Sequence, residues 1–518
     1  MAPFAIALLL GILSAFGFAP FHLWPLMLLA FGLLYLPLAK AQRGWQAALI
    51  GWSFGLGQFA LGLDWIAKAF TYQANMPAWL GWVAVVLLSM YLAIYPALAA
   101  FAAWWGTRRL GGGSATMALL FGAGWAVCEW LRATVFTGFP WNPVSVAMVD
   151  LPLAQAARFT GTYALSGLVV ASAGFILILA MRPKDSLTRK TIATAANIPA
   201  AIGLGLLVGL YVVPALLRQF DPPLPPPFPK GPVVHIIQPN IDQGDRWDPS
   251  LAARHLALEQ ALSGIPGDRP RLILWPESGI ELNVLEDPAA RAQLASILGP
   301  KDILMGGGDS PIRDRTGEEV EAGNSIFTIG SGGKLIARYD KAHLVPWGEY
   351  LPMRPLMSAI GLSRLVPGAI DFRPGPGPAT IDVPGFGKVG MQLCYEIVFS
   401  GRVVNEAYRP DFIFAPSNDA WFGASGPPQH LAQARMRAIE EGLPIARATQ
   451  NGISALIDAD GRILHQIDAH QSGMIELPLP APRAPTIFSR TGNLAVALIA
   501  LLLTGLAFAA RRYKEGFI

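Results

Sequence analysis

The sequence predicts a bundle of membrane-spanning helices joined to a layered α/β domain, for three reasons. Of its 518 residues, 53% are hydrophobic and only 14% are charged, whereas a soluble domain carries roughly 25% charged residues. Eight apolar stretches are present, seven of them within the first 218 residues; several reach the roughly 20 residues needed to cross a membrane, and the shorter ones could cross with flanking aromatic residues. Between the seventh and the eighth, short apolar runs alternate with polar helical patterns, which indicates a separate domain.

The apolar stretches define the predicted membrane bundle, which we place at residues 1–218 and complete with an eighth helix and basic tail at 488–518. The expected spans are Ala2–Phe18, Leu23–Ala39, Ala47–Leu63, Trp79–Trp105, Ala115–Phe136, Gly161–Met181, Ala195–Leu216 and Leu494–Ala510. No basic segment precedes the first span and another apolar run follows almost at once. We therefore interpret it as a retained helix and not as a cleaved secretion signal.

Basic residues fall in alternate loops and predict the orientation of the bundle. They are Lys40, Arg43, Arg108, Arg109, Arg182, Lys184, Arg189, Lys190, Arg511, Arg512 and Lys514, whereas the intervening short loops hold little beyond Lys68 and Arg158. The positive-inside rule places the basic loops and both termini in the cytoplasm. The polar domain between the last two spans is then expected on the opposite face of the membrane.

Glu129 and Arg132 lie three residues apart near the end of the fifth span and could pair on one helical face. Charged residues at membrane depth are costly and often functional, but such a pair could also extend to the lipid headgroups, and both interpretations stay open. The two cysteines, Cys128 and Cys394, lie in an apolar span and in the polar domain. No disulfide between them is expected, and Cys128 is interpreted as a small packing residue.

The polar domain is predicted at residues 231–487, after a proline-rich spacer at 219–230 that includes DPPLPPPFPK. Expected strands are Val233–Gln238, Leu272–Trp275, Ile303–Met305, Ser325–Ile329, Leu335–Tyr339, Val389–Leu393, Phe412–Ala415 and Ile453–Ile457, with helices at Leu251–Leu262 and His430–Glu441. Continuous apolar runs suit strands that are buried on both faces. No zinc spacing or phosphate-binding loop is present, and the small, dispersed net charge of +4 gives no sign of nucleic-acid binding. We expect no metal and no cofactor.

Polar residues of types that can act in catalysis follow several of the predicted strands. Glu277 lies in LILWPESG, Lys341 and Glu349 lie in YDKAHLVPWGEY, and Cys394 lies in VGMQLCYEIVFS. Each residue alone could be structural, as a turn cap, a solvated lysine or a small buried cysteine. In α/β sheets, however, sites form beyond the carboxyl ends of the strands. We therefore expect these segments to converge in one cleft.

The motifs WPES, YDKAHLVPWGEY and CYE, in this order, resemble the Glu–Lys–Cys triad of the nitrilase superfamily of carbon–nitrogen hydrolases, over residues 231–487. Such a domain between the seventh and eighth of eight membrane helices resembles the apolipoprotein N-acyltransferase family, as do FTGFPWN at 136–142, QPN at 238–240 and SNDAWFG at 417–423. The resemblance implies a four-layer αββα sandwich in a bacterial inner-membrane enzyme. It also implies a phospholipid as acyl donor and a diacylglyceryl apolipoprotein as acceptor.

The expected chemistry is acyl transfer through a thioester on Cys394. Glu277 would act as general base and the Lys341 ammonium would stabilise the oxyanion. By resemblance, the further site residues are Glu349, Tyr395 and Glu396 in supporting roles and Trp247, Trp421 and Phe422 in substrate binding. The three aromatic residues of the last group could also simply pack the domain or dock it on the membrane.

Two other functions remain open from the sequence. In a membrane-tethered amidase of the nitrilase type, water would resolve the thioester, but one anchoring helix would suffice for a hydrolase. In a binding platform on a transporter-like bundle, the spans would need more polar residues than they have. We expect the chain to act as a monomer.

Overall fold

The computed structural model describes residues 1–72, 77–181, 198–220, 233–359 and 370–512. The chain divides into two compact units, of which the first consists of Met1–Asp64, Trp82–Pro222 and Thr486–Ile518, and the second of Trp65–Gly81 and Pro223–Pro485. Several predicted features lie outside the described residues: the basic loop residues Arg182, Lys184, Arg189 and Lys190, Lys514, and the proline-rich spacer Asp221–Lys230.

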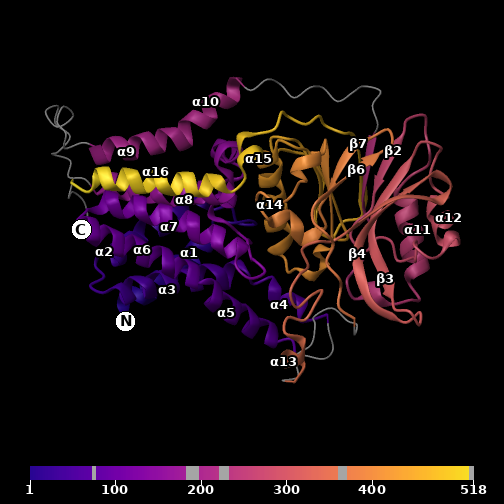
Figure 1. The fold of residues 1–518 in the computed structure, drawn as a ribbon, viewed down its shortest axis with the longest axis horizontal. Helices are drawn as coiled ribbons and strands as arrows, with labels where there is room; N and C mark the ends of the chain where they lie inside the picture. Colours follow the sequence, from indigo (N-terminus) through magenta and orange to yellow (C-terminus); the bar gives the residue numbers. More distant parts are fainter. Residues whose placement is uncertain (73–76, 182–197, 221–232, 360–369, 513–518) are drawn as a thin grey trace. The chain divides into compact units, whose positions relative to one another are not determined.

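The first unit consists of helices, and each predicted apolar stretch overlaps at least one of them. The helices are α1 (Ala2–Ala15), α2 (Trp24–Ala39), α3 (Gly44–Gly62), α5 (Leu80–Leu92), α6 (Ile94–Leu110), α7 (Ser114–Thr134), α8 (Ala157–Ala180), α9 (Ile198–Leu207), α10 (Val213–Phe220), α15 (Ile487–Thr491) and α16 (Leu494–Ala510). A π-helical turn, Val208–Val212, joins α9 to α10. The last helix, α16, runs along α7 and α8 (Figure 1), and the three share an apolar core that includes Ala126, Tyr163 and Val496.

Three helical segments among the described residues are long and apolar enough to cross a membrane: Leu80–Leu110, Ser114–Thr134 and Pro152–Ala180. Four shorter apolar helices have 10–17 residues: Ala2–Ala15, Trp24–Ala39, Ala201–Leu216 and Leu494–Ala510. The helical nature of the predicted spans is therefore confirmed, whereas their number as membrane-crossing helices is not decided by length and composition.

Glycines allow some of these helices to approach to backbone contact. A Cβ added to Gly11 of α1 would lie 2.0 Å from the carbonyl oxygen of Phe54 in α3, and one added to Gly57 of α3 would lie 2.3 Å from that of Leu8. Helix association in lipid depends on such close van der Waals contact, because apolar area alone gives little preference for protein over lipid. These glycines therefore fix the spacing of α1 and α3.

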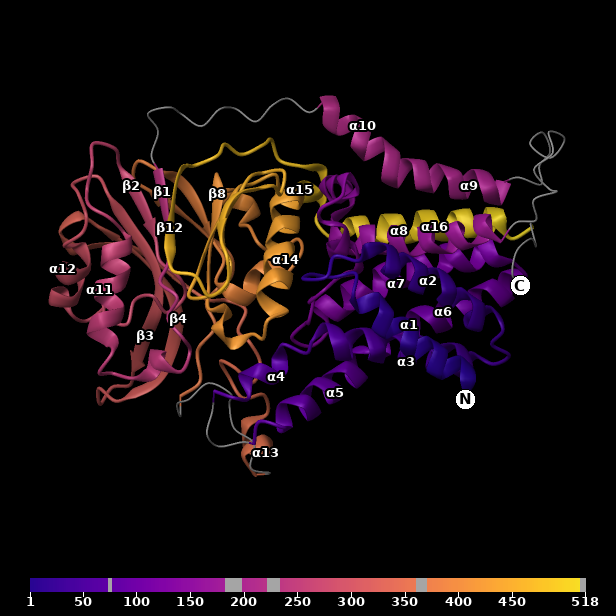
Figure 2. The ribbon, with the colours of Figure 1, turned by 180° about the vertical axis from the view of Figure 1, so that it is seen from behind.

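The second unit is built from two six-stranded sheets (Figure 2). The first has the order β12-β1-β2-β3-β4-β5 and the second the order β11-β10-β9-β8-β7-β6. The strands of the first are β1 (Val233–Gln238), β2 (Arg271–Leu274), β3 (Ile303–Arg313), β4 (Glu319–Gly330), β5 (Lys334–Asp340) and β12 (Gly473–Pro478). Those of the second are β6 (Ala379–Val383), β7 (Gly387–Met391), β8 (Phe412–Ser417), β9 (Ile445–Thr449), β10 (Ser454–Ile457) and β11 (Ile463–Ile467).

The sheets pack face to face, with helices on their outer faces. Residues of both sheets form one buried core, among them Ile236, Leu274, Met391 and Phe414. Helices α11 (Ala252–Leu262) and α12 (Pro288–Ala295) cover the outer face of the first sheet, and α14 (Gly426–Glu441) covers that of the second (Figure 1). This is the αββα order that the family resemblance implied. Two short helices, α4 (Ile66–Ala69) and α13 (Arg354–Ala359), complete the unit.

The strand directions bring the predicted site segments to common edges. Strands β1, β2 and β3 are parallel, and β5 runs parallel to them because β4 is antiparallel to both β3 and β5. Strands β7, β8 and β9 are likewise parallel. The carboxyl ends of β2 and β5 therefore share one edge of the first sheet, and those of β7 and β8 share one edge of the second.

Candidate active site

Cys394 begins the short 3₁₀ helix η8 (Cys394–Val398), three residues after the end of β7. Its backbone has a φ of +53°, a left-handed conformation that costs a residue other than glycine roughly 1 kcal/mol or more. The side chain is buried, and the Ser417 hydroxyl lies 3.2 Å from its sulfur. Strain of this kind persists only where the surrounding structure maintains it, and it is concentrated at functional sites.

Glu277 lies three residues beyond β2, and groups from both sheets hold its carboxylate. Asn324 of β4 donates a side-chain hydrogen bond to Oε1 at 2.8 Å. The backbone N–H of Asn418, directly after β8, donates to Oε2 at 2.7 Å. The side chain of Gln450 also donates to the backbone carbonyl of Glu277 at 3.1 Å. Two separate segments therefore hold the carboxylate, and a third holds the backbone of the same residue.

Lys341 follows β5 directly and is fully buried. Its Nζ lies 3.0 Å from Oε1 of Glu349 and 3.8 Å from Oε1 of Glu277. Asn324 donates to the same Glu349 oxygen at 2.7 Å, and the backbone N–H of Val345 donates to Oε2 at 2.8 Å. Three predicted site residues thus form one buried cluster, in which Asn324 bridges the two carboxylates.

The surroundings of Cys394 and Lys341 determine their protonation. Burial raises the pKa of the Cys394 thiol well above its ordinary value and Glu277 raises it further, while Lys341 acts in the opposite direction. Burial acts to lower the pKa of Lys341, but the negative charges of Glu349 and Glu277 outweigh it, so that this pKa lies above its ordinary value. At neutral pH the site therefore holds a neutral thiol and a protonated lysine.

Glu396 connects the loop after β5 to the residue that precedes the η8 helix. Its Oε1 accepts hydrogen bonds from the backbone N–H groups of Ala342 at 2.8 Å and His343 at 3.0 Å. Its Oε2 accepts one from the N–H of Leu393 at 2.8 Å, and the Tyr339 hydroxyl lies 2.9 Å from both oxygens. Burial raises the pKa of Glu396, against the effect of these hydrogen bonds. The carboxyl group thus cross-links two loops of the site.

Tyr395 is buried among aromatic rings beside the nucleophile segment. Its ring centroid lies 5.8 Å from that of His343 and 5.2 Å from that of Phe399. His343 and Phe399 are themselves 4.0 Å apart. The three rings therefore pack the η8 helix against the loop that follows β5.

The three predicted substrate-binding aromatics have different positions. Trp421 packs at right angles against Tyr72, with ring centroids 5.8 Å apart, and Phe422 packs against Trp65 at 4.5 Å. Both partners belong to the segment Trp65–Gly81, which is part of the same unit. Trp247 ends a short 3₁₀ helix, and its side chain lies outside the described residues.

A second polar network, which the sequence analysis did not predict, contacts Cys394. Asp419 accepts hydrogen bonds from Ser417 at 2.7 Å and from Arg447 at 2.5 Å, and His430 Nδ1 lies 3.0 Å from its Oδ1. The other ring nitrogen of His430 lies 3.2 Å from the backbone carbonyl oxygen of Cys394. All four network side chains are fully buried. Ser417 and Asp419 lie in the SNDAWFG motif at the end of β8, and this strand-end position was the signal that could have revealed them.

In the first unit, the structure excludes the interpretation that Glu129 and Arg132 extend to the lipid headgroups. Both side chains are buried within the bundle, 3.8 Å apart, and do not extend to a surface. Glu129 accepts hydrogen bonds from Trp125 and from the backbone of Val144. Arg132 donates to the backbone carbonyls of Phe139 and Trp141, at 2.7 and 2.8 Å. The pair therefore fastens the FTGFPWN loop to α7.

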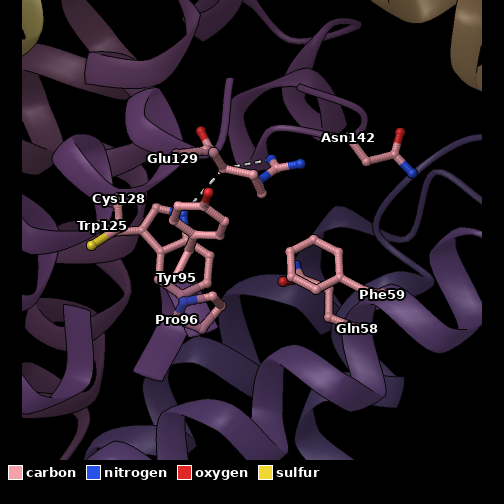
Figure 3. A pocket seen from close by; sticks show the side chains of 9 residues that line it. Gln58, Phe59, Tyr95, Pro96, Trp125, Cys128, Glu129 and Asn142 are labelled. Carbon is pink, nitrogen blue, oxygen red and sulfur yellow. Dashed lines mark hydrogen bonds and ion pairs between the residues drawn. The ribbon is translucent and has the colours of Figure 1, made fainter. Parts of the chain in front are cut away.

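A small cavity borders this pair and is also lined by Gln58, Tyr95 and Asn142 (Figure 3). Three buried atoms of these residues lack a hydrogen-bond partner among the described residues: Gln58 Nε2, Glu129 Oε2 and Asn142 Oδ1. Buried polar groups of this kind are commonly satisfied by ordered water. As to metals, the described part of the chain contains no group of three or more His, Cys, Asp or Glu that could hold an ion.

Comparison with known proteins identifies the family. Residues 10–175 match the family model described as the apolipoprotein N-acyltransferase N-terminal domain, and residues 234–483 match that of carbon-nitrogen hydrolase. The apolipoprotein N-acyltransferase of Rhodopseudomonas palustris is 34% identical over 522 residues, which cover 98% of this chain and 95% of that protein. This chain belongs to the apolipoprotein N-acyltransferase family. The apolipoprotein N-acyltransferase of Bradyrhizobium diazoefficiens is 35% identical over 525 residues, which again cover 98% of this chain and 95% of that protein.

Membership of the apolipoprotein N-acyltransferase family, together with the apolar helices, identifies the chain as a membrane protein with a nitrilase-type α/β domain. Among solved structures, an amidase from a Nesterenkonia species is 17% identical and covers 49% of this chain and 93% of its own, with a TM-score of 0.31. The sheet order and the family match carry the fold assignment, and the predicted family resemblance is confirmed.

Proposed function

We propose that this apolipoprotein N-acyltransferase family member transfers the sn-1 acyl chain of a phospholipid to the α-amino group of the N-terminal diacylglyceryl-cysteine of apolipoproteins. The names of the relatives support the reaction class, and one observation in the structure carries the chemistry. A buried thiol, a buried protonated lysine and a carboxylate fixed at two oxygens lie within electrostatic reach of one another. This combination suits thioester formation and needs no cofactor.

In the proposed first half-reaction, Glu277 takes the proton of the Cys394 thiol, whose raised pKa keeps it protonated until substrate arrives. The sulfur attacks the ester carbonyl carbon, and the Lys341 ammonium stabilises the oxyanion, a contribution of about 3–4 kcal/mol for a well-placed donor. The carbon–oxygen bond then breaks. The departing lysophospholipid oxygen takes the proton from Glu277, and the acyl group remains on the sulfur as a thioester.

In the proposed second half-reaction, the α-amino group of the acceptor attacks the thioester carbonyl and loses a proton to Glu277. Collapse breaks the carbon–sulfur bond, forms the amide and returns the proton to the sulfur. We propose that Glu349 and Glu396 support the site by holding Lys341 and the two loops in place, and that Tyr395 supports it by packing. Trp247, Trp421 and Phe422 are proposed to contact the lipid substrates.

We further propose that eight helices cross the bacterial inner membrane, with the bundle at residues 1–218, a spacer at 219–230, the catalytic domain at 231–487 and the last helix at 488–518. The alternation of basic loops supports cytoplasmic termini and a catalytic domain on the outer face. We propose a monomer, since one chain carries the complete triad. Labelling of single introduced cysteines from either side of sealed vesicles tests this orientation.

Intact-mass measurement of the full chain in vesicles tests the reaction. With phospholipid alone, we expect an acyl adduct on Cys394 that persists until an amine acceptor is added. Rapid discharge to water would instead support the amidase, and the absence of an adduct would support the binding platform. Cys394→Ser should abolish transfer because the weaker oxygen nucleophile replaces the thiol, whereas Cys128→Ala should retain it. Near-normal transfer by Cys394→Ser would contradict the mechanism.

A further inference from the structure

The Ser417 hydroxyl has two acceptors within reach and one proton to give. Its Oγ lies 3.2 Å from the Cys394 sulfur and 2.7 Å from Oδ1 of Asp419. A hydroxyl can donate only one hydrogen bond at a time. While Cys394 is a neutral thiol, the charged and closer Asp419 is the stronger acceptor. Once the sulfur carries a negative charge, it becomes a competing anionic acceptor.

Asp419 can lose the hydrogen bond from Ser417 without being left unpaired. Arg447 donates to its Oδ2 at 2.5 Å, and His430 contacts its Oδ1 at 3.0 Å. Although burial acts to raise the pKa of Asp419, Arg447 and His430 outweigh it and hold this pKa below its ordinary value. The carboxylate therefore stays ionised and retains two partners when the hydroxyl turns away.

The backbone of Cys394 is held in the same network, which keeps the sulfur within reach of Ser417. A ring nitrogen of His430 lies 3.2 Å from the Cys394 carbonyl oxygen, at the residue whose left-handed φ has to be maintained. Ser417 itself ends β8, whose hydrogen bonds to the neighbouring β9 extend to the Ser417–Thr449 pair. Both ends of the sulfur–hydroxyl contact are thus fixed by rigid elements.

We propose that Ser417 is a positioning residue for the nucleophile, whose hydroxyl donates to Asp419 in the resting enzyme and turns to donate to the Cys394 thiolate when Glu277 has taken the thiol proton. Only hydrogen bonds are exchanged, and no further reactant is needed. The inference rests on the proposed function, because it gives Ser417 a role only if Cys394 is the nucleophile.

The test measures the rate at which iodoacetamide alkylates Cys394 in the full-length protein, followed on its peptide by mass spectrometry between pH 7 and 9. Only the thiolate reacts, so that the rate reports the ionised fraction. The titratable and charged groups near the sulfur are Glu277, Lys341, Glu396, Asp419, His430 and Arg447. They are unchanged in Ser417→Ala, so any shift is assigned to the hydroxyl.

We expect Ser417→Ala to slow the alkylation by up to roughly tenfold, because a hydrogen bond to a charged group is worth about one pKa unit or more and the hydroxyl gives up its bond to Asp419 to make it. Ser417→Thr, which keeps the hydroxyl, should restore the rate. Asp419→Asn should have the opposite effect and speed the alkylation, because it removes both the competing acceptor and a negative charge that raises the thiol pKa. A purely structural role would not produce opposite signs in the two variants.

Ser454→Ala provides the matched control, since this buried hydroxyl on the nearby strand β10 bonds to Thr449 instead. It should be alkylated at the unaltered rate, and thermal unfolding checks that each variant is folded. An unaltered or faster rate in Ser417→Ala, or a slower rate in Asp419→Asn, would overturn the inference. Failure of the proposed function is separately visible, because alkylation of Cys394 in the unaltered protein would then leave acyl transfer intact.

Discussion

Replacing Glu396 by glutamine should loosen one side of the active site and not the other. The glutamine amide has only one acceptor oxygen, while three backbone N–H groups now point at the carboxylate. The oxygen should stay where Ala342 and His343 both donate, because the opposite orientation would leave two N–H groups unpaired. The amide nitrogen then faces the N–H of Leu393, directly before the nucleophile.

The expected magnitude follows from the number of partners lost. One buried N–H without an acceptor costs about 1–3 kcal/mol, and 2 kcal/mol corresponds to roughly 30-fold faster local opening. Hydrogen–deuterium exchange, resolved to single amides, should therefore accelerate by about this factor at Leu393 and change little at Ala342 and His343. Glu396→Ala should accelerate all three, since no acceptor remains.

Glu476→Gln is a suitable control because this glutamate is largely exposed, at 56% of its side-chain surface, and lies on strand β12. It should leave the three amides unchanged. Equal acceleration at Leu393 and at Ala342 and His343 in Glu396→Gln would refute the reasoning. The two carboxylate oxygens could not then be holding the two loops independently.

Three further predictions concern other parts of the chain. Asn324→Leu removes the donor shared by two active-site carboxylates, and the acyl-transfer rate should fall at least about tenfold; an unaltered rate would contradict this. Burial raises the pKa of Glu441 to about 7, above the unfolded value, so the folded state binds this proton more tightly. Stability should fall by about 3 kcal/mol as pH rises from about 4.5 through 7, and in Glu441→Gln the thermal midpoint should vary less over this window; an unchanged pH dependence would argue against the assignment. Gly11→Ala should destabilise the bundle by roughly 1–3 kcal/mol or more, measured as the unfolding midpoint in detergent, whereas Gly205→Ala, with open space at its Cβ, should not; equal effects would count against the close contact.

The main strands and the catalytic candidates were predictable because local sequence determines them. Val233–Gln238 is a continuous run that is buried on both faces, and the structure has a strand with the same bounds. The strand Ile445–Thr449 was not predicted, since Arg447 interrupts its apolar pattern. Burial of that arginine is tolerable only because Asp419, 28 residues earlier in the chain, pairs with it. No local pattern encodes such a partner.

The same limit separates the predicted site residues from those that were missed. Glu277, Lys341 and Cys394 each follow a strand, and the carboxyl ends of parallel strands meet at one edge of a sheet whatever the strand order. The role of Asn324 depends on the register between β3, β4 and β5, which places it beside two carboxylates from other segments. Sequence alone gives neither that register nor the direction of the side chain, so Asn324 could not be told apart from the other polar residues of β4, such as Ser325 and Thr328.

The glycine contact between α1 and α3 has a consequence for genetic suppression. All three nearest atoms that an added Cβ at Gly11 would meet are backbone atoms, two of Phe54 and one of Gln58. No substitution on α3 can make a carbonyl oxygen smaller, so we expect no single side-chain change on α3 to rescue a bulkier residue at position 11. Gly44 differs, because its nearest neighbour is the Phe101 ring, which a smaller side chain can replace. A screen for restored acyl transfer should therefore find suppressors for the second position but not on α3 for the first.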